Sequence, residues 1–131
     1  MKSLIVGAQG LVGSALKKCI PNALEGIQVE AKTNSNQRYM DITKHETLFK
    51  VFSEYRPDVV YLAGAIAYVD KCEKSVGTNH VNVLGSTTVL RLCEQFNSKL
   101  VFFSSSYVFD GESDKPYTTS DVKNPINIYG V

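Results

Sequence analysis

The sequence has no tryptophan, few cysteines and almost no net charge. Its 14 lysines and arginines nearly balance its 13 aspartates and glutamates, which leaves a formal net charge of +1 at pH 7. This balance provides no electrostatic footprint for nucleic acid or for an anionic membrane. The apolar runs also fall short of the roughly 18 residues that a membrane span requires. We therefore expect neither nucleic acid nor a membrane as a partner.

The three cysteines indicate reduced thiols rather than a disulfide framework or a metal site. Cys19, Cys72 and Cys93 form no Cys-x-x-Cys pair, and their number is odd. We expect a cytoplasmic protein without a metal centre, and a catalytic cysteine stays an alternative. The first residues loosely imitate a signal peptide, but Gln9 interrupts the apolar run and Lys17-Lys18 stands where a cleavage site would be expected. A first strand and helix explain this segment better.

Short apolar runs alternate with segments of helical periodicity along the chain. The patterns predict strands at residues 4–6, 27–31, 39–40, 59–62 and 100–103. They predict helices at residues 11–20, from a capping box at Thr43 and Glu46 to Tyr55, and at 79–96. In the last helix, the residues expected to face inward include Val81, Leu84, Leu92 and Phe96. Strands separated by helices favour one α/β domain over residues 1–131, with a Rossmann-like, doubly wound parallel sheet.

A glycine-rich turn joins the first predicted strand to the first predicted helix. It reads Gly7-Ala8-Gln9-Gly10-Leu11-Val12-Gly13. In such a turn the first glycine permits the tight bend, the second lets the backbone approach a pyrophosphate, and the third allows close helix–strand packing. The turn therefore predicts a dinucleotide site, with candidate residues Gly7, Gly10, Leu11, Val12 and Gly13; the alternative is a glycine-rich turn that binds nothing.

The choice between NAD and NADP stays open in the sequence. An acidic residue at the end of the second strand would accept ribose hydroxyls of NAD, whereas a basic residue would suit the 2′-phosphate of NADP. Glu30 and Lys32 both lie there, so the two signals compete. Asp41-Ile42, after the predicted third strand, could flank the adenine, and a plain helix-entry role is an equal alternative.

Four segments together resemble the extended short-chain dehydrogenase/reductases, and within them the dTDP-4-dehydrorhamnose reductase family. The segments are GAQGLVG, RPDVVYLAGAIAYVDKCE, VNVLG, and SSSYVFDG followed by PINIYG. The run from Tyr107 to Gly111 is the most discriminating, because sugar epimerases of this superfamily usually carry Val-Tyr-Gly there. The resemblance covers essentially the whole chain but only the N-terminal part of a typical family member.

The resemblance implies roles for several residues in the middle of the chain. Ala63, Gly64 and Ala65 match the segment that lines the cofactor, although Leu62 replaces the usual asparagine before it. Asn82 matches an asparagine that supports the active site through backbone contacts, with helix packing as the alternative. Asp70, within the family's Val-Asp-Lys run, is a surface or substrate-side residue.

The resemblance also implies a catalytic pair near the end of the chain. Ser105, with Ser104 and Ser106 as alternatives one position away, would hold the substrate oxygen, and Tyr129 would protonate it as hydride arrives. Tyr129 would also lie against the nicotinamide ribose, which with a nearby lysine lowers its pKa from about 10. Tyr107, Phe109 and Tyr117 are expected to be packing or loop residues. The family's lysine should follow Tyr129 by four positions, and this chain ends two positions after it.

From these features we expect the cofactor-binding part of an NAD(P)-dependent reductase that acts on a nucleotide-linked 4-keto sugar. The chain should lack the last strands and the substrate domain, turn over little or nothing alone, and self-associate through exposed apolar surface, which makes a homo-oligomer possible. One alternative is a non-catalytic binding subunit resembling the regulatory subunit of methionine adenosyltransferase. Another is a different extended nucleotide-sugar reductase or epimerase.

Overall fold

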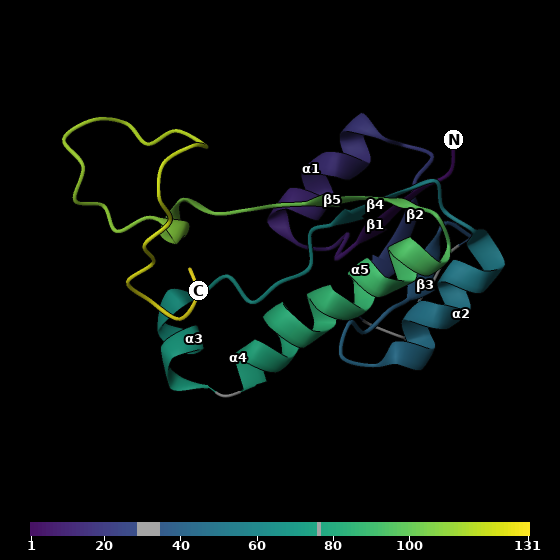
Figure 1. Cartoon of the computed structure of the whole chain (residues 1–131). Helices are drawn as coiled ribbons and strands as arrows, with labels where there is room; N and C mark the ends of the chain where they lie inside the picture. The colour runs from purple at the N-terminus through teal and green to yellow at the C-terminus, as the bar shows by residue number, and fades with distance from the viewer. Residues whose placement is uncertain (29–34, 76) are drawn as a thin grey trace.

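A computed structural model describes residues 1–28, 35–75 and 77–131, and a parallel sheet forms its centre (Figure 1). The five described strands are β1 (Ser3–Val6), β2 (Leu24–Ile27), β3 (Gln37–Tyr39), β4 (Val59–Leu62) and β5 (Lys99–Phe102). They pair in the spatial order β3-β2-β1-β4-β5, and all four pairings are parallel. The strand order therefore reverses direction between β1 and β4, as in Rossmann folds, and the predicted fold is confirmed.

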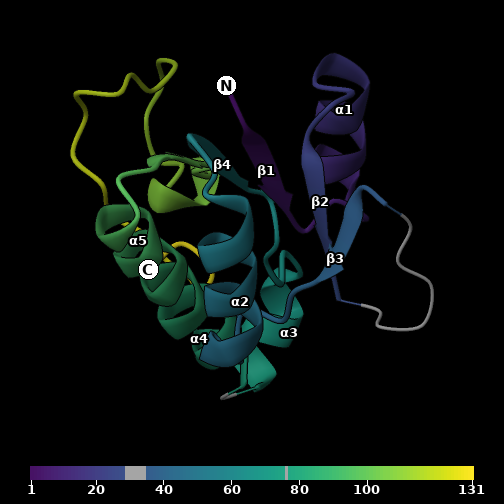
Figure 2. The same cartoon turned by 90° about the vertical axis from the view of Figure 1, so that its right-hand side faces the viewer.

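Helices cover both faces of this sheet. The described helices are α1 (Leu11–Cys19), α2 (His45–Tyr55), α3 (Val69–Lys74), α4 (Gly77–Asn79), η2 (His80–Gly85), α5 (Ser86–Gln95) and η3 (Ser106–Val108). Figure 2 shows α1 on one face and α2 with α5 on the other. The long helix predicted at 79–96 is confirmed in extent, but its η2 portion has π-helical hydrogen bonding. Such insertions in a helix are frequent near functional sites.

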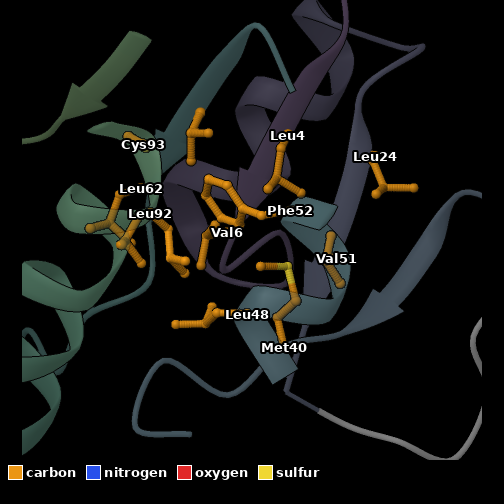
Figure 3. Close-up of a cluster of buried hydrophobic side chains, with 12 residues drawn as sticks. Leu4, Val6, Leu24, Met40, Leu48, Val51, Phe52, Leu62, Leu92 and Cys93 are labelled. Carbon is orange, nitrogen blue, oxygen red and sulfur yellow. The ribbon is translucent and has the colours of Figure 1, made fainter. Parts of the chain in front are cut away.

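The alternation of side chains along β1 sends apolar groups into two separate cores. Leu4 and Val6 point into the larger cluster, under α2 and α5, while Ile5 belongs to the cluster under α1. Phe52 of α2 lies at the centre of the larger cluster and is fully buried (Figure 3). Because both faces of β1 are covered, the strand reads as a continuous apolar run, as expected of a parallel sheet.

The second strand begins three residues earlier than its predicted position. The alternating Ile27, Val29 and Ala31 suggested a strand at 27–31, but β2 spans Leu24–Ile27; Val29 and Ala31 lie outside the described residues. Alternation marks a strand that is buried on one face, whereas β2 pairs with β1 and β3 in the interior. Gly26 fits here because a Cβ at this position would lie 2.6 Å from Met40 Sδ.

The predicted capping box at Thr43 and Glu46 is wrong. The N-cap residue of α2 is Lys44, with no capping hydrogen bond from its side chain. The Thr43 hydroxyl instead donates to Asp41 Oδ1 at 2.7 Å, so it serves the turn before the helix. The end of α2 is as predicted: Arg56 adopts a left-handed conformation at φ 53°, and Pro57 follows.

One predicted core position is also wrong. Leu84, in the π-helical segment η2, is 55% exposed, whereas Leu92 is buried and Phe96 packs against the larger cluster. In the described part of the chain, no helix combines the length and apolar character needed to cross a membrane.

Candidate functional site

The turn after β1 owes two of its glycines to contacts within the protein. Gly7 has φ +84°, and a Cβ there would lie 2.5 Å from the Cα of Gly64. A Cβ at Gly13 would lie 2.2 Å from the Gly7 carbonyl oxygen, so the first turn of α1 passes directly over the loop. The N–H groups of Gly7 and Ala8 both donate to the carbonyl oxygen of Gly26, which ties the loop to β2.

Gly10 differs from these two because no protein atom requires it. A Cβ at Gly10 would come no closer than 3.5 Å to another residue, and φ is −72°, a value that any residue adopts. Gly10 is nevertheless the N-cap of α1 and borders an open cleft. A glycine with space above it, at the start of a helix, leaves room for a phosphate to approach the backbone. The residues present therefore fit a dinucleotide pyrophosphate.

The cleft lies at the carboxyl ends of β1, β2 and β4, where the strand order reverses. Its volume is about 400 Å³, within the range of small-molecule sites. Seven of the predicted site residues line it: Gly7, Gly10, Asp41, Ile42, Ala63, Gly64 and Ala65. The structure thus brings the glycine turn, the segment after β3 and the segment after β4 to one cavity.

The other predicted cofactor residues lie off this cavity. Leu11 and Val12 are exposed on the first turn of α1, and Gly13 is buried behind the loop. Lys32 and Glu30 fall outside the described residues. Among the described side chains, no group of His, Cys, Asp and Glu is arranged to hold a metal ion.

Asp41 organises the turn that forms one wall of the cleft. Its Oδ1 accepts hydrogen bonds from the Thr43 N–H at 3.0 Å and the Thr43 hydroxyl at 2.7 Å. Burial acts to raise the pKa of the Asp41 carboxyl, but these hydrogen bonds and the Lys44 ammonium lower the pKa below its ordinary value. The Asp41 carboxylate is therefore ionised, and its Oδ1 is engaged in hydrogen bonds with Thr43 inside the turn. Its position at the entry to α2 is compatible with both predicted roles.

Asn82 and Gly85, in η2, contact two different segments that line the cleft. The Asn82 side chain accepts from the Ile66 N–H at 2.8 Å and donates to the Ile66 carbonyl oxygen at 3.0 Å. These are the backbone contacts that the resemblance implies, and a direct cofactor contact stays a prediction. A Cβ at Gly85 would lie 2.9 Å from Ile42 Cγ1, so the glycine lets η2 pack against the Asp41-Ile42 turn.

The two predicted catalytic residues lie in neighbouring segments beyond β5. Ser105 precedes η3, and its Oγ accepts a hydrogen bond from the Tyr107 N–H at 3.2 Å. The ring of Tyr107 contacts the ring of Tyr129 edge to face, with centroids 5.8 Å apart. Tyr107 is thus a packing residue, as predicted, and it brings Tyr129 into the neighbourhood of Ser105. Neither Ser105 nor Tyr129 lines the cleft itself.

Sequence reasoning missed two polar residues of this region. Lys71 lines the cleft, whereas the neighbouring Asp70, singled out in the sequence, does not. Asp110 accepts hydrogen bonds from the Tyr117 hydroxyl, the Asn124 side-chain amide and the Glu112 N–H. These bonds, led by that from Tyr117, hold the pKa of Asp110 at about 2. The Val-Asp-Lys and Tyr-Val-Phe-Asp-Gly runs were the available signals, but neither indicates what its charged residue contacts.

Comparisons with known proteins agree with this geometry. The dTDP-4-dehydrorhamnose reductase of Burkholderia thailandensis is 33% identical over 136 residues, covering 99% of this chain and 42% of that protein. The enzyme of the same name from Aggregatibacter actinomycetemcomitans is 31% identical over 128 residues, covering 97% of this chain and 42% of that protein. The chain therefore spans less than half the length of these curated relatives.

Solved structures give the same result. A hypothetical dTDP-4-dehydrorhamnose reductase from Sulfolobus tokodaii superposes with a TM-score of 0.86 and 30% identity, over 99% of this chain and 48% of that one. A dTDP-4-dehydrorhamnose reductase from Bacillus anthracis, solved in complex with NADP, gives 0.82 and 28%, over 99% of this chain and 46% of that one. The family model described as the RmlD substrate binding domain matches residues 1–131, and the chain belongs to that family.

Proposed function

We propose that the protein binds a nicotinamide dinucleotide in the cleft and serves the reduction of a nucleotide-linked 4-keto sugar. The observation that carries this proposal is Gly10, which lines the cleft with Ala63, Gly64 and Ala65 although no protein contact requires a glycine there. The names of the relatives support a dTDP-linked 4-keto sugar as substrate. The NADP complex of the Bacillus anthracis relative favours NADP over NAD.

The chain offers each part of a dinucleotide a different wall of the cleft. The backbone from Gly7 to Gly10, with the start of α1, would hold the pyrophosphate. Asp41 and Ile42 would border the adenine, and Ala63 to Ala65, held close to Gly7, would run along the nicotinamide half. When bound in its reduced form, the dinucleotide supplies the hydride that the C4 carbonyl carbon of the sugar accepts.

Ser105 and Tyr129 would act on the oxygen of that carbonyl. As the carbon gains hydride, the C=O π pair moves onto the oxygen, and the Tyr129 hydroxyl proton completes the alcohol. The Ser105 hydroxyl would donate a hydrogen bond that holds the oxygen in place. The Ser105 Oγ accepts from the Tyr107 N–H, so its own proton remains available for this role.

Cofactor binding and turnover can be tested separately on the protein expressed from its natural gene. We expect NADPH to bind in calorimetry, and NADPH-dependent reduction of dTDP-4-dehydrorhamnose to follow. Tyr129→Phe should keep cofactor binding and lose about a hundredfold or more in kcat, because the proton donor is removed. Tyr68→Phe, which removes a hydroxyl from an exposed tyrosine beside the cleft loop, is the matched control and should change neither.

The same experiment separates the alternatives. Binding of NADPH without turnover on any 4-keto sugar nucleotide would favour the non-catalytic binding subunit. Turnover on another nucleotide sugar, but not on dTDP-4-dehydrorhamnose, would favour a different reductase or epimerase. Absence of binding by both NADPH and NADH would contradict the proposal as a whole.

A cytoplasmic location and a homo-oligomer complete the proposal. Cys19, Cys72 and Cys93 are free thiols, and burial, with Glu94 nearby, raises the pKa of Cys93 to about 11, so this buried thiol is neutral and unreactive. Exposed Val83, Leu84 and Leu90 on the η2–α5 helix offer apolar area for a second copy. Sedimentation of the natural protein would contradict the oligomer if it gave only the monomer mass.

A further inference from the structure

A single hydrogen bond links α3 to the segment that carries Tyr129. The Glu73 carboxylate accepts the Ile128 N–H through Oε1 at 2.7 Å, across 55 residues of sequence. Figure 1 shows the yellow end of the chain beside α3. A hydrogen bond to an ionised acceptor is about twice as strong as one between neutral groups. This contact therefore holds the residue directly before Tyr129.

The turn around Tyr129 has two further anchors. Asn127 Oδ1 accepts the Gly130 N–H at 2.9 Å, the pattern of a helix N-cap. A Cβ at Gly130 would lie 2.0 Å from the Tyr107 carbonyl oxygen, so the turn sits tightly against η3. The first anchor is local to the turn and the second joins it to the Ser105 segment. Among the described residues that hydrogen-bond to this turn, only Glu73 lies outside the C-terminal segment (residues 103–131), on helix α3.

The helix that carries Glu73 is itself fixed to the cleft. Lys71 of α3 lines the cavity. The buried Cys72 donates through Sγ to the Ile66 carbonyl oxygen at 3.5 Å, and Ile66 is also held by Asn82. These contacts couple the short helix to the loop that borders the cleft. The contact from Glu73 to Ile128 therefore connects that loop, through α3, to the residue before Tyr129.

We propose that Glu73 is a positioning residue for Tyr129, which holds the tyrosine in register with the cofactor cleft by binding the Ile128 N–H. The inference rests on the proposed function, since positioning matters only if Tyr129 meets a substrate. Loss of the carboxylate would remove the link between the turn and α3 while leaving the glycine turn, the cleft and Tyr129 itself unchanged. Misplacement of a catalytic group by about 1 Å can cost up to a hundredfold in rate.

The test compares the protein expressed from its natural gene with its variants Glu73→Ala and Glu73→Gln. In Glu73→Ala we expect faster amide hydrogen exchange in the peptide that covers residues 126–131, and a kcat lower by about tenfold. NADPH binding, KM for the cofactor and thermal stability should not change. Glu73→Gln should recover part of both effects, because its amide oxygen can still accept the Ile128 N–H. The matched control is Glu54→Ala, which removes an exposed carboxylate on α2 and should leave exchange and kcat as they were.

Each other outcome overturns the inference in a recognisable way. Unchanged exchange in Glu73→Ala means that the hydrogen bond does not hold the turn. Faster exchange with unchanged kcat means that the bond is structural only. A wild-type protein that reduces no 4-keto sugar nucleotide refutes the proposed function and with it the positioning role, while the exchange data still report whether Glu73 holds Ile128.

Discussion

The sheet region, residues 3–102, and the C-terminal segment, residues 103–131, are held together by different forces. Every side chain of the two apolar clusters belongs to the sheet region. In the C-terminal segment, all of which is described, no residue is buried. That segment is ordered by polar contacts and by two aromatic pairs, Tyr107 with Tyr129 and Phe109 with Tyr117. The cofactor cleft belongs to the first region and the predicted catalytic pair to the second.

Cofactor binding and proton transfer to the substrate therefore depend on different kinds of contact. Walls of the cleft are placed by strand pairing, helix packing and close backbone contacts, which many residues share. The turn that carries Tyr129 is held by a few hydrogen bonds, by the contact between the Tyr107 and Tyr129 rings and by the packing of Gly130 against η3. So small a set of contacts can open locally without global unfolding. Substitutions in the sheet region should therefore affect global stability, and substitutions in the C-terminal segment should affect local order or rate.

Phe52→Ala should cause the largest loss of stability. Phe52 is fully buried at the centre of the larger cluster, so the substitution leaves a cavity and should lower the free energy of unfolding by about 4 kcal/mol. Urea unfolding followed by circular dichroism measures this loss. Phe49→Ala, one turn away on α2 and 40% exposed, is the control and should cost about 1 kcal/mol. Equal losses for the two variants would contradict the assigned core.

Gly13→Ala and Gly10→Ala should have opposite effects on stability and on cofactor binding. The Cβ added at Gly13 would meet the Gly7 carbonyl oxygen at 2.2 Å, so the loop must shift, which should lower the free energy of unfolding by about 3 kcal/mol. Gly10→Ala meets no protein atom closer than 3.5 Å and should unfold like the wild type. It should nevertheless weaken NADPH binding, because the methyl group occupies the space proposed for the pyrophosphate. Unchanged binding by Gly10→Ala, measured by calorimetry, would place the dinucleotide elsewhere.

Asn82→Ala should have an intermediate effect. The substitution removes both hydrogen bonds to the Ile66 backbone and should cost about 1.5 kcal/mol. Because Ile66 lines the cleft, NADPH binding should weaken as well. Thr87→Ala removes a hydroxyl that bonds only within its own helix, to the Val83 carbonyl oxygen, and serves as the control in the same unfolding and binding experiments. A cost no larger than that of the control would argue against the Asn82 contacts as a clamp on the cleft loop.

The sequence was most informative where local patterns and tertiary structure agree. The apolar run Val59–Leu62, after Pro57, predicted β4 to the residue because both of its faces are covered. The glycine turn was predictable for a similar reason, since backbone geometry at Gly7 and Gly13 admits no other side chain. The start of β2 was missed because Leu24–Ile27 contains Glu25 and Gly26. These two residues are accommodated in a buried strand only through contacts with side chains from elsewhere in the chain. Lys17 pairs with Glu25 at 2.9 Å, and Met40 covers Gly26.

The polar contacts of the C-terminal segment were not predictable for a related reason. Asn124 lies 14 residues from its partner Asp110, and Ile128 lies 55 residues from Glu73. Single carboxylates on a short helix or in a loop carry no periodic signal, so their partners emerge only from the fold. The resemblance identified the segments that matter, but it assigned no role to Asp110, Glu73 or Lys71.

The smallest and most local effect should come from acidification of the Asp110 loop. Hydrogen bonds from Tyr117, Asn124 and Glu112 hold the pKa of this carboxyl at about 2, below the ordinary value of about 3.9 that applies in the unfolded chain. A lowered folded-state pKa means that the ordering contribution is complete above about pH 4 and is lost as the pH falls toward 2. We therefore expect the Tyr117 ring, stacked on Phe109 with centroids 4.4 Å apart, to lose its ring-current shifts in NMR spectra over this range.

Asp110→Asn should show the same loss at neutral pH, because the amide cannot replace the charge that Tyr117 and Asn124 hydrogen-bond. Global unfolding should barely change, since the segment contributes no buried side chain. Asp114→Asn, in the same exposed loop, is the matched control and should keep the wild-type spectrum. If Asp110→Asn lowered the unfolding midpoint as much as Asn82→Ala, the C-terminal segment would be part of the cooperative core, and the contrast between the two regions would fail.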